Sequence, residues 1–375
     1  MTIRPQDGAV KFIAVDRYVE TNIVAPTEVS THGSSGRILW GKKNDYPHYL
    51  LALYRDVASL GSIVNGSVDY VAGNGATLRT ELFPTGKVNR KGELAIDIVR
   101  GVALDWFIYG GFALEVIRGL DGRPAEINVL GMENLRTNKD CTVFWYSEKW
   151  DKGGRDALEL PAFMPDLDWA TLDADARNRH ASSVLFVKNT RKQTYPLPIY
   201  AQAVKACEIE RCIDEYHLNS INNGFAADVI VSMNNGVPAD DVKKEIEKDI
   251  QDKFTGQENA GRFILTFAPD RQHSMTVTPL QTADFGQKYD ALYKRSRQQI
   301  FTSFRANPNL FGIPTESLGF SDEEYRSAFD LYNRTQIRPV QDRIIDAFDR
   351  ICGGTGVLTI APFSLAENAA PNTVE

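Results

Sequence analysis

The sequence predicts an α+β protein whose main feature is a pair of long helices separated by a small insert. The first observation is helical periodicity over residues 196–225, and the second is a similar pattern over residues 282–306. The third is a set of short runs rich in β-branched and aromatic residues, which precede the first helix and lie between the two. Such runs are typical of strands, so helices and sheets are expected together.

Composition indicates a folded protein of two or three domains. The chain has 375 residues, of which 43% are hydrophobic and 24% are charged. It starts with a polar segment and has no apolar run near the roughly 20 residues that span a bilayer, so we expect neither a signal peptide nor a membrane partner. The four cysteines show no C-x-x-C spacing, which favours reduced thiols in the cytoplasm over a disulfide framework or a zinc site.

The N-terminal part predicts an arm followed by helices. Residues 1–39 are rich in loop-forming types and predict an arm with one short strand. Residues 40–195 predict a mixed α/β domain. It starts with a helix near Pro47, breaks near Gly61 and continues as a second helix that closes at Gly73.

The rest of this domain predicts mainly strands. A helix runs into a strand at Gly110, and the Asp121-Gly122 pair between two apolar runs predicts a β-hairpin. Two more strands are expected at residues 141–146 and 182–189. Between them, residues 151–180 have no clear period and are interpreted as a surface excursion.

The first long helix is assigned to residues 196–225. Two prolines fix an extended approach, because proline is tolerated before a helix and in its first turn but not further inside. The helix is expected to begin near Ile199 and to end near Gly224. Apolar residues recur every three or four positions, which predicts one buried stripe. The stripe consists of Ile199, Ala203, Ala206, Ile209, Ile213 and Tyr216.

Residues 226–281 predict a compact α/β insert, and residues 282–306 the second long helix. The helix of the insert is expected over residues 241–254, where Val242, Ile246, Ile250 and Phe254 form a narrow apolar stripe. The long helices differ in charge. Residues 282–306 contain five basic and two acidic residues, a net of +3, whereas residues 199–221 contain two basic and four acidic residues, a net of −2.

Opposite net charge predicts that the two long helices pair, within one subunit or between subunits. The candidate pairing residues are Glu208, Asp214, Glu215, Arg295 and Arg297. The basic face of the second helix has two further interpretations, a solvated surface and a contact with DNA.

Residues 307–320 interrupt the helical pattern with two prolines and two glycines. The segment is roughly double the usual length of about 2 to 8 residues between helices, which favours a loop with its own function over an ordinary connection. Helix resumes over residues 321–352, where Ser321 and Glu324 fit a capping box and Pro339 predicts a kink. Residues 353–375 predict a short strand and a tail.

The order of these elements resembles that of the portal proteins of tailed bacteriophages, the head-tail connector family. The resemblance is carried by the proline-marked approach, the long helix ending Asn223-Gly224-Phe225, and the strand-like run ADVIVSM that follows it. A further likeness is the Asp45-Tyr46-Pro47 start of the first helix, with its glycine-rich end. The resemblance covers residues 40–352.

The resemblance implies a portal-like architecture. Residues 40–195 would form the first part of a mixed α/β wing domain, and the two long helices would be stem helices. Residues 226–281 would form the clip, residues 307–320 a channel loop, and residues 321–352 the kinked wing helix.

The resemblance also implies a function in the virion. Twelve copies would form a homo-oligomeric ring at the capsid vertex, assembled in the host cytoplasm, through which double-stranded DNA enters and leaves. Its partners would be the terminase large subunit, the major capsid protein with its scaffold, and a head-completion or connector protein. A net charge of −7 suits a channel along which DNA slides, because tight phosphate binding requires clustered lysine and arginine.

The candidate contact residues follow from this resemblance. The residues expected in the channel loop are Asn307, Asn309, Thr315 and Ser317. The residues expected to dock terminase are Lys243, Lys244 and Lys248.

The alternative is a soluble α/β enzyme, such as a nucleotide-handling hydrolase. Gly256 to Gly261 has the spacing of a phosphate loop, but Arg262-Phe263 follows where Lys-Ser/Thr is needed. The five histidines are scattered singly, without metal-ligand spacing. We therefore expect no catalytic, cofactor or metal site.

Overall fold

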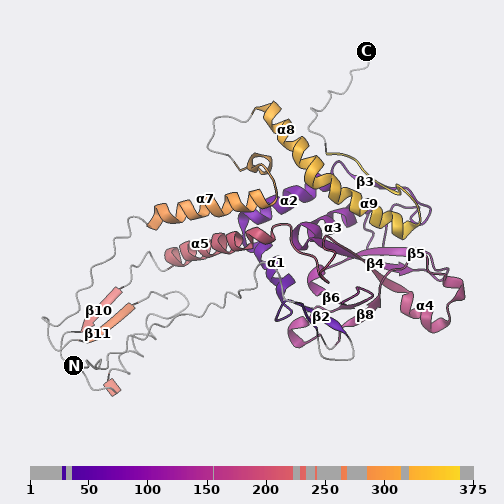
Figure 1. Ribbon diagram of the computed structural model, residues 1–375, viewed down its shortest axis with the longest axis horizontal. Helices are drawn as coiled ribbons and strands as arrows, with labels where there is room; N and C mark the ends of the chain where they lie inside the picture. Colours follow the sequence, from indigo (N-terminus) through magenta and orange to yellow (C-terminus); the bar gives the residue numbers. More distant parts are fainter. Residues whose placement is uncertain are drawn as a thin grey trace, which may run out of the picture.

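A computed structural model describes residues 28–30, 36–154, 156–222, 229–233, 241–242, 263–267, 285–313 and 321–363. The α+β class predicted from the sequence is confirmed (Figure 1). The helices of this part are α1 (Tyr46–Asp56), α2 (Ala58–Ala72), α3 (Ala95–Tyr109), α4 (Ala174–His180), α5 (Val204–Asn222), α7 (Phe285–Ser303), α8 (Asp322–Tyr332) and α9 (Arg338–Cys352). The strands are β1 (Glu28–Ser30), β2 (Arg37–Trp40), β3 (Ala76–Leu78), β4 (Gly111–Arg118), β5 (Pro124–Leu130), β6 (Leu135–Asn138), β7 (Val143–Tyr146), β8 (Leu158–Pro161), β9 (Ser182–Lys188), β10 (Val229–Met233), β11 (Phe263–Phe267) and β12 (Leu358–Ile360).

Two antiparallel sheets form the base of the body. One has the strand order β1-β2-β6-β7-β8 and the other has the order β5-β4-β9. They meet just after β8, where the Phe163 amide donates to the Val184 carbonyl of β9 at 2.8 Å. The core lies between the sheets and helices α1, α2, α3 and α9, with Trp40, Phe107, Phe112 and Phe348 almost completely buried.

The junction of α3 and β4 follows the sequence closely. Gly110 ends the helix in the left-handed conformation, with φ of 83°, and β4 then pairs with β5 through the predicted hairpin at Asp121-Gly122. The backbone of another segment passes very near this glycine. A Cβ at Gly110 would lie only 1.9 Å from the carbonyl oxygen of Leu197, on the approach to α5. The glycine is therefore required by conformation and by space together.

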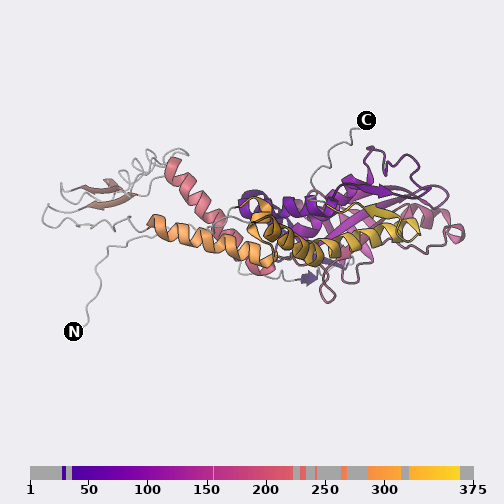
Figure 2. The same ribbon diagram turned by 90° about the horizontal axis from the view of Figure 1, so that it is seen from above.

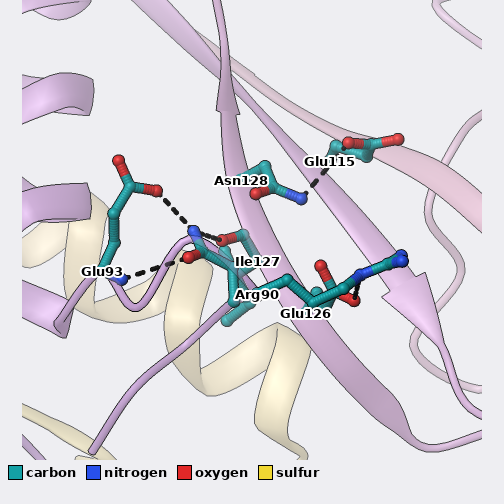
Figure 3. Close-up of polar contacts among 7 residues, drawn as sticks. Arg90, Glu93, Glu115, Glu126, Ile127 and Asn128 are labelled. Atoms are coloured by element: carbon teal, nitrogen blue, oxygen red, sulfur yellow. Dashed lines mark hydrogen bonds and ion pairs between the residues drawn. The ribbon is translucent and has the colours of Figure 1, made fainter.

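The outer edge of β5 is closed by residues 87–94 (Figure 3). The Ile127 amide donates to the Val88 carbonyl at 2.8 Å, and the Asn89 side chain donates to the Ile127 carbonyl at 3.1 Å. Arg90 pairs with Glu126 over the same edge. An open strand edge is a template for unwanted pairing, so this segment protects the sheet.

Helices α5 and α7 lie side by side and extend together away from the body (Figures 1 and 2). Strands β10 and β11 form a parallel pair beyond their far ends. The two predicted long helices are therefore present as α5 and α7, and β10 and β11 lie between them in the sequence. Most of the helix predicted over residues 241–254 lies outside the described residues, and Val242, expected in its apolar stripe, is exposed.

Three boundaries in the body differ from the predictions. The break between α1 and α2 lies at Val57, which is extended, and not at Gly61, which lies inside α2. The glycine at 61 reflects a close approach instead, because a Cβ there would lie 3.2 Å from the Tyr54 carbonyl oxygen. The predicted arm should end before Arg37, since β2 pairs with β6 and buries Trp40.

The third difference lies in residues 151–180, which are not a plain surface excursion. They contain β8 and α4, together with short 3₁₀ turns. Two aspartates that looked like turn residues are helix caps. Asp168 accepts from the Ala170 amide, and Asp173 accepts from the Ala176 amide at 2.7 Å.

The C-terminal helical segment changes form just before Pro339. Between α8 and α9 the backbone is a π-helix over Asn333–Ile337. A proline lacks the amide hydrogen and crowds the carbonyl one turn earlier, so a wider turn at this point accommodates it. The predicted capping box is present, because the Ser321 side chain accepts from the Glu324 amide and the Glu324 side chain accepts from the Ser321 amide.

The Gly110 junction predicts a large effect of one methyl group. Gly110→Ala should lower the free energy of unfolding by more than the about 1 to 2 kcal/mol that the left-handed conformation alone costs a side chain. The matched control is Gly153→Ala, because Gly153 has the same φ of 83° but no neighbouring atom within 4 Å. Urea denaturation of both variants measures the difference, and equal losses would contradict the proposed backbone contact.

Candidate functional site

The approach to α5 is fixed to the first sheet by two stacked aromatic rings. Tyr195 lies on Trp40 with ring centroids 4.5 Å apart and nearly parallel planes. The Tyr195 hydroxyl donates to the Ile38 carbonyl and accepts from the Thr137 amide at 3.0 Å, so it joins β2 and β6. Two prolines then carry the chain to α5, which begins later than predicted. A 3₁₀ turn over Ala201–Ala203 replaces the expected start near Ile199.

The contact between α5 and α7 is apolar near the body and aromatic further out. Near the body, Phe304 just beyond α7 stacks on Tyr200 with centroids 5.6 Å apart, and Ile300 and Phe301 are buried. Further out, Tyr216 of α5 stacks on Tyr289 of α7 with centroids 5.0 Å apart. Packing of apolar and aromatic groups therefore contributes directly to this helix pair.

The buried stripe of α5 differs from the predicted one. Ala203, Ala206 and Ile213 are buried as expected, but Ile209 and Tyr216 are 39% and 49% exposed. The inner face of α5 instead contains Glu210, a charged residue with 0% exposure that was not among the predicted stripe or pairing residues. Its signal was its spacing of seven from Ala203 and four from Ala206, which places an acid inside the apolar stripe.

Glu210 caps a helix other than its own. α2 begins after Val57, whose side chain accepts no capping hydrogen bond. The Ser59 amide, at the open start of α2, donates to the Glu210 carboxylate at 3.0 Å, while the other carboxylate oxygen is buried without a protein partner. A carboxylate at a helix N-terminus satisfies a free amide and interacts favourably with the helix dipole.

Several groups set the protonation of Glu210. Burial raises the pKa of Glu210 above its ordinary value, and the bond from Ser59 lowers it. The nearby charge of Asp214 raises this pKa, whereas that of Arg297 on α7 lowers it. Arg297 also lies over the Tyr293 ring, 5.8 Å from its centroid. Glu210 of α5 therefore interacts with polar or charged groups of both α2 and α7.

The five predicted pairing residues have different environments. Glu208 accepts from Arg211 at 2.8 Å within α5, and Arg211 lies 3.7 Å from Asp56 of α1, so this group of charges faces α1. Asp214 and Arg295 are exposed, while Glu215 and Arg297 are half-buried. Of the two basic residues, Arg297 lies near the buried Glu210 of α5, whereas Arg295 is exposed.

The first half of the predicted channel loop is docked on the body. Residues 308–311 form a 3₁₀ helix whose first amide is capped by Asn307, since the Asn309 amide donates to the Asn307 side chain at 3.0 Å. Leu310 is buried. Thr315 and Ser317 lie outside the described residues, as do Lys243, Lys244 and Lys248 of the predicted terminase site.

The described residues contain neither a membrane-spanning helix nor a metal-binding cluster. In those ranges, no helix has both the length and the apolar character to cross a bilayer. The same ranges contain no group of three or more His, Cys, Asp or Glu side chains that could hold a metal ion.

The Glu210 contact predicts a pH-dependent stability. Because the folded state raises the pKa of Glu210, it binds this proton more tightly than the unfolded chain. The tighter proton binding of Glu210 thus stabilises the folded state fully below the pKa of an unfolded glutamate, about 4.3. This stabilisation is lost as pH rises through the higher pKa of Glu210 in the folded state. Glu210→Gln keeps an acceptor for Ser59 but cannot titrate.

The free energy of unfolding of the wild-type protein, minus that of Glu210→Gln, should therefore fall as pH rises through this interval. Urea denaturation over a pH series measures it, with the exposed Glu323→Gln as control for removal of one carboxylate. A difference independent of pH would contradict the assignment. Glu210→Ala, which leaves the Ser59 amide unsatisfied, should be less stable than Glu210→Gln by about 1 to 3 kcal/mol at every pH, because neither variant titrates at this position.

No protein-family model matches the sequence, and no curated protein resembles it at a significant level. Several solved structures resemble its fold. A chain in the virion of a native gene transfer agent particle has 16% identity and a TM-score of 0.54, over 87% of this chain and 85% of that one. A chain in the neck of the native particle, computed with C12 symmetry, has 17% identity and a TM-score of 0.53, over 90% of this chain and 88% of that one.

A third likeness is weaker. The crystal structure of an HK97 family phage portal protein from Corynebacterium diphtheriae has 10% identity and a TM-score of 0.48, over 83% of this chain and 93% of that one. This chain is therefore similar in fold to a chain in the virion and a chain in the neck of the gene transfer agent particle.

Proposed function

We propose that this chain is the subunit of a portal ring, through which double-stranded DNA enters and leaves a capsid. The observation that carries the proposal is the pair α5 and α7, which extends from an α/β body and is followed directly by a docked connection and by α8 and α9. This is the order of elements that the portal resemblance implies. The likeness to a chain in a neck computed with C12 symmetry supports a ring of twelve copies.

The surface of the helix pair supports assembly with further copies of the chain. Large apolar side chains are exposed on both helices, including Ile209 and Leu218 on α5 and Leu292 on α7, with exposures of 39%, 59% and 42%. A second copy placed beside this pair would cover them, at a gain of roughly 25 cal/mol for each Å² of apolar surface buried. Rotational symmetry would repeat the same contact at every interface of a closed ring.

The remaining roles complete the proposal. The ring would nucleate head assembly with the capsid protein and scaffold, and would dock the terminase large subunit through residues 226–281 and a connector protein afterwards. It would sit at the capsid vertex and carry out no chemistry of its own. DNA would pass the channel loop, residues 307–320, without tight binding, because each strong phosphate contact would have to be broken at every step.

Ring assembly should depend on Arg295. The proposed contact joins the basic face of α7 to the acidic face of α5 in the next subunit, and Arg295 is exposed, whereas reversing Arg297 would also disturb Glu210. Arg295→Glu should therefore reduce the yield of rings and leave thermal unfolding nearly unchanged. Each surface pair contributes at most about 1 kcal/mol, but the loss recurs at every interface.

Light scattering of the purified protein measures ring yield. The matched control reverses three charges in the insert, Lys243, Lys244 and Lys248, which should lower DNA packaging but not ring yield. Normal ring yield in Arg295→Glu would contradict the proposed pairing, and normal packaging in the triple variant would contradict terminase docking on the insert.

A positive charge in the channel loop should slow DNA passage. Asn309→Lys and Thr315→Lys together place new ammonium groups where uncharged polar contacts are proposed, and cations bind phosphate in a salt-dependent way. We expect shorter packaged genomes at low salt and partial recovery at high salt. Packaged length across a salt series measures this, and wild-type length at every salt concentration would exclude the loop from the DNA path.

A further inference from the structure

One face of α2 is shaped to hold the segment that follows α7. Ser62, Gly66 and Tyr70 are spaced by four residues and so lie along one side of the helix. The Ser62 hydroxyl donates to the Phe311 carbonyl at 3.4 Å, and the Tyr70 hydroxyl donates to the Leu310 carbonyl at 2.7 Å. Ser62 lies one helical turn before Gly66, and Tyr70 lies one turn after it. Their hydroxyls thus bind two consecutive backbone carbonyls, those of Phe311 and Leu310.

Gly66 provides the space for the Phe311 ring. A Cβ added at Gly66 would lie 2.6 and 2.8 Å from two carbon atoms of that ring, closer than nonbonded carbons approach. Glycine inside a helix costs about 1 kcal/mol relative to alanine, so its presence here requires a compensating contact. The Phe311 ring is that contact.

The same ring joins three helices. Phe311 makes edge contacts with Tyr70 of α2, Phe301 of α7 and Tyr332 of α8, with centroids 5.8, 5.9 and 5.6 Å apart. Tyr332 is itself held to α2 by a hydrogen bond of 2.7 Å with Ser67. The docked segment is therefore connected to α2 and to the helices on either side of it in sequence.

We propose that Leu310 and Phe311 form an anchor that positions the channel loop. The face formed by Ser62, Gly66 and Tyr70 is the positioning site, and it holds the loop through the carbonyls of Leu310 and Phe311 and through the Phe311 ring. This inference rests on the proposed function for the loop's role, while the docking itself can be tested without it.

The competing explanation is that Phe311 only fills the core. Both explanations predict a loss of stability when the ring is displaced, so stability does not distinguish them. A positioning role makes two further demands. Displacement should free residues 308–313 locally, and it should impair DNA packaging in rings that assemble normally.

The test uses Gly66→Ala, whose methyl group would collide with the ring. Gly61→Ala is the matched control, because it lies in the same helix and gains the same helix propensity, while its methyl group would meet the Tyr54 carbonyl at 3.2 Å and no atom of Phe311 within 4 Å. It therefore reproduces a close contact that does not involve the ring. The rescue variant combines Gly66→Ala with Phe311→Val, which removes both ring atoms that the methyl group would meet. Hydrogen exchange reports opening through the amides of Leu310 and Ile313, which are bonded to Asn307 and Pro308.

We expect the amides of residues 309–313 to exchange about tenfold faster or more in Gly66→Ala, with little change in α9 or in the control. The amount of packaged DNA per ring should fall in Gly66→Ala, remain normal in Gly61→Ala, and recover in the double variant. Equal exchange in the Gly66 and Gly61 variants would overturn the anchor. Faster exchange with normal packaging would overturn its positioning role.

Failure of the proposed function gives a different result. If the wild-type chain formed no ring, the portal assignment would fall, whereas the exchange rates of the three variants would still decide whether the anchor exists.

Discussion

The hydrogen bond between the Ser59 amide and the buried Glu210 carboxylate is the contact on which the arrangement of the long helices depends. α2 begins without a cap from its own sequence, and α5 supplies one across the junction. Breaking this bond would leave a buried amide and a buried carboxylate without partners, which costs more than the bond itself contributes. This bond thus fixes α5 against the start of α2 within an otherwise apolar surface, together with the contacts of Tyr195 with the first sheet and of Arg211 with Asp56 of α1. α7 follows because its rings pack against α5.

α2 also joins the rest of the chain. Its middle holds Leu310 and Phe311, and its Ser67 bonds to Tyr332 at the end of α8. Near its C-terminus the Val71 carbonyl accepts from Gln341 of α9 at 2.9 Å. Segments that are far apart in the sequence thus meet on one helix of fifteen residues. A helix that several segments contact needs small residues where those segments approach closely. This requirement explains Ser62, Ser67 and Gly66 in α2.

The surface of the helix pair supports the proposed ring. The polar contacts at the junction are already used to hold helices together. The exposed groups are apolar side chains on a projecting helix pair, suited to contact with further copies of the chain. A net charge of −7 is compatible with weak contact between the protein and passing DNA. The proposed function thus follows from shape and surface, and from the order of elements.

The sequence by itself determined the features that depend on local chemistry. The α3–β4 junction at Gly110, the hairpin at Asp121-Gly122, the Ser321 cap and the order of long helix, insert and long helix were all predicted, because each depends on conformational preferences of residues close in the chain. The tertiary structure decided the rest. It placed Glu210 inside the core, because its partner amide is about 150 residues earlier in the sequence and no local pattern reveals it. It also placed the first half of the predicted channel loop, residues 307–313, against α2. The space beside Gly66 accepts the Phe311 ring only when helices far apart in the sequence pack together.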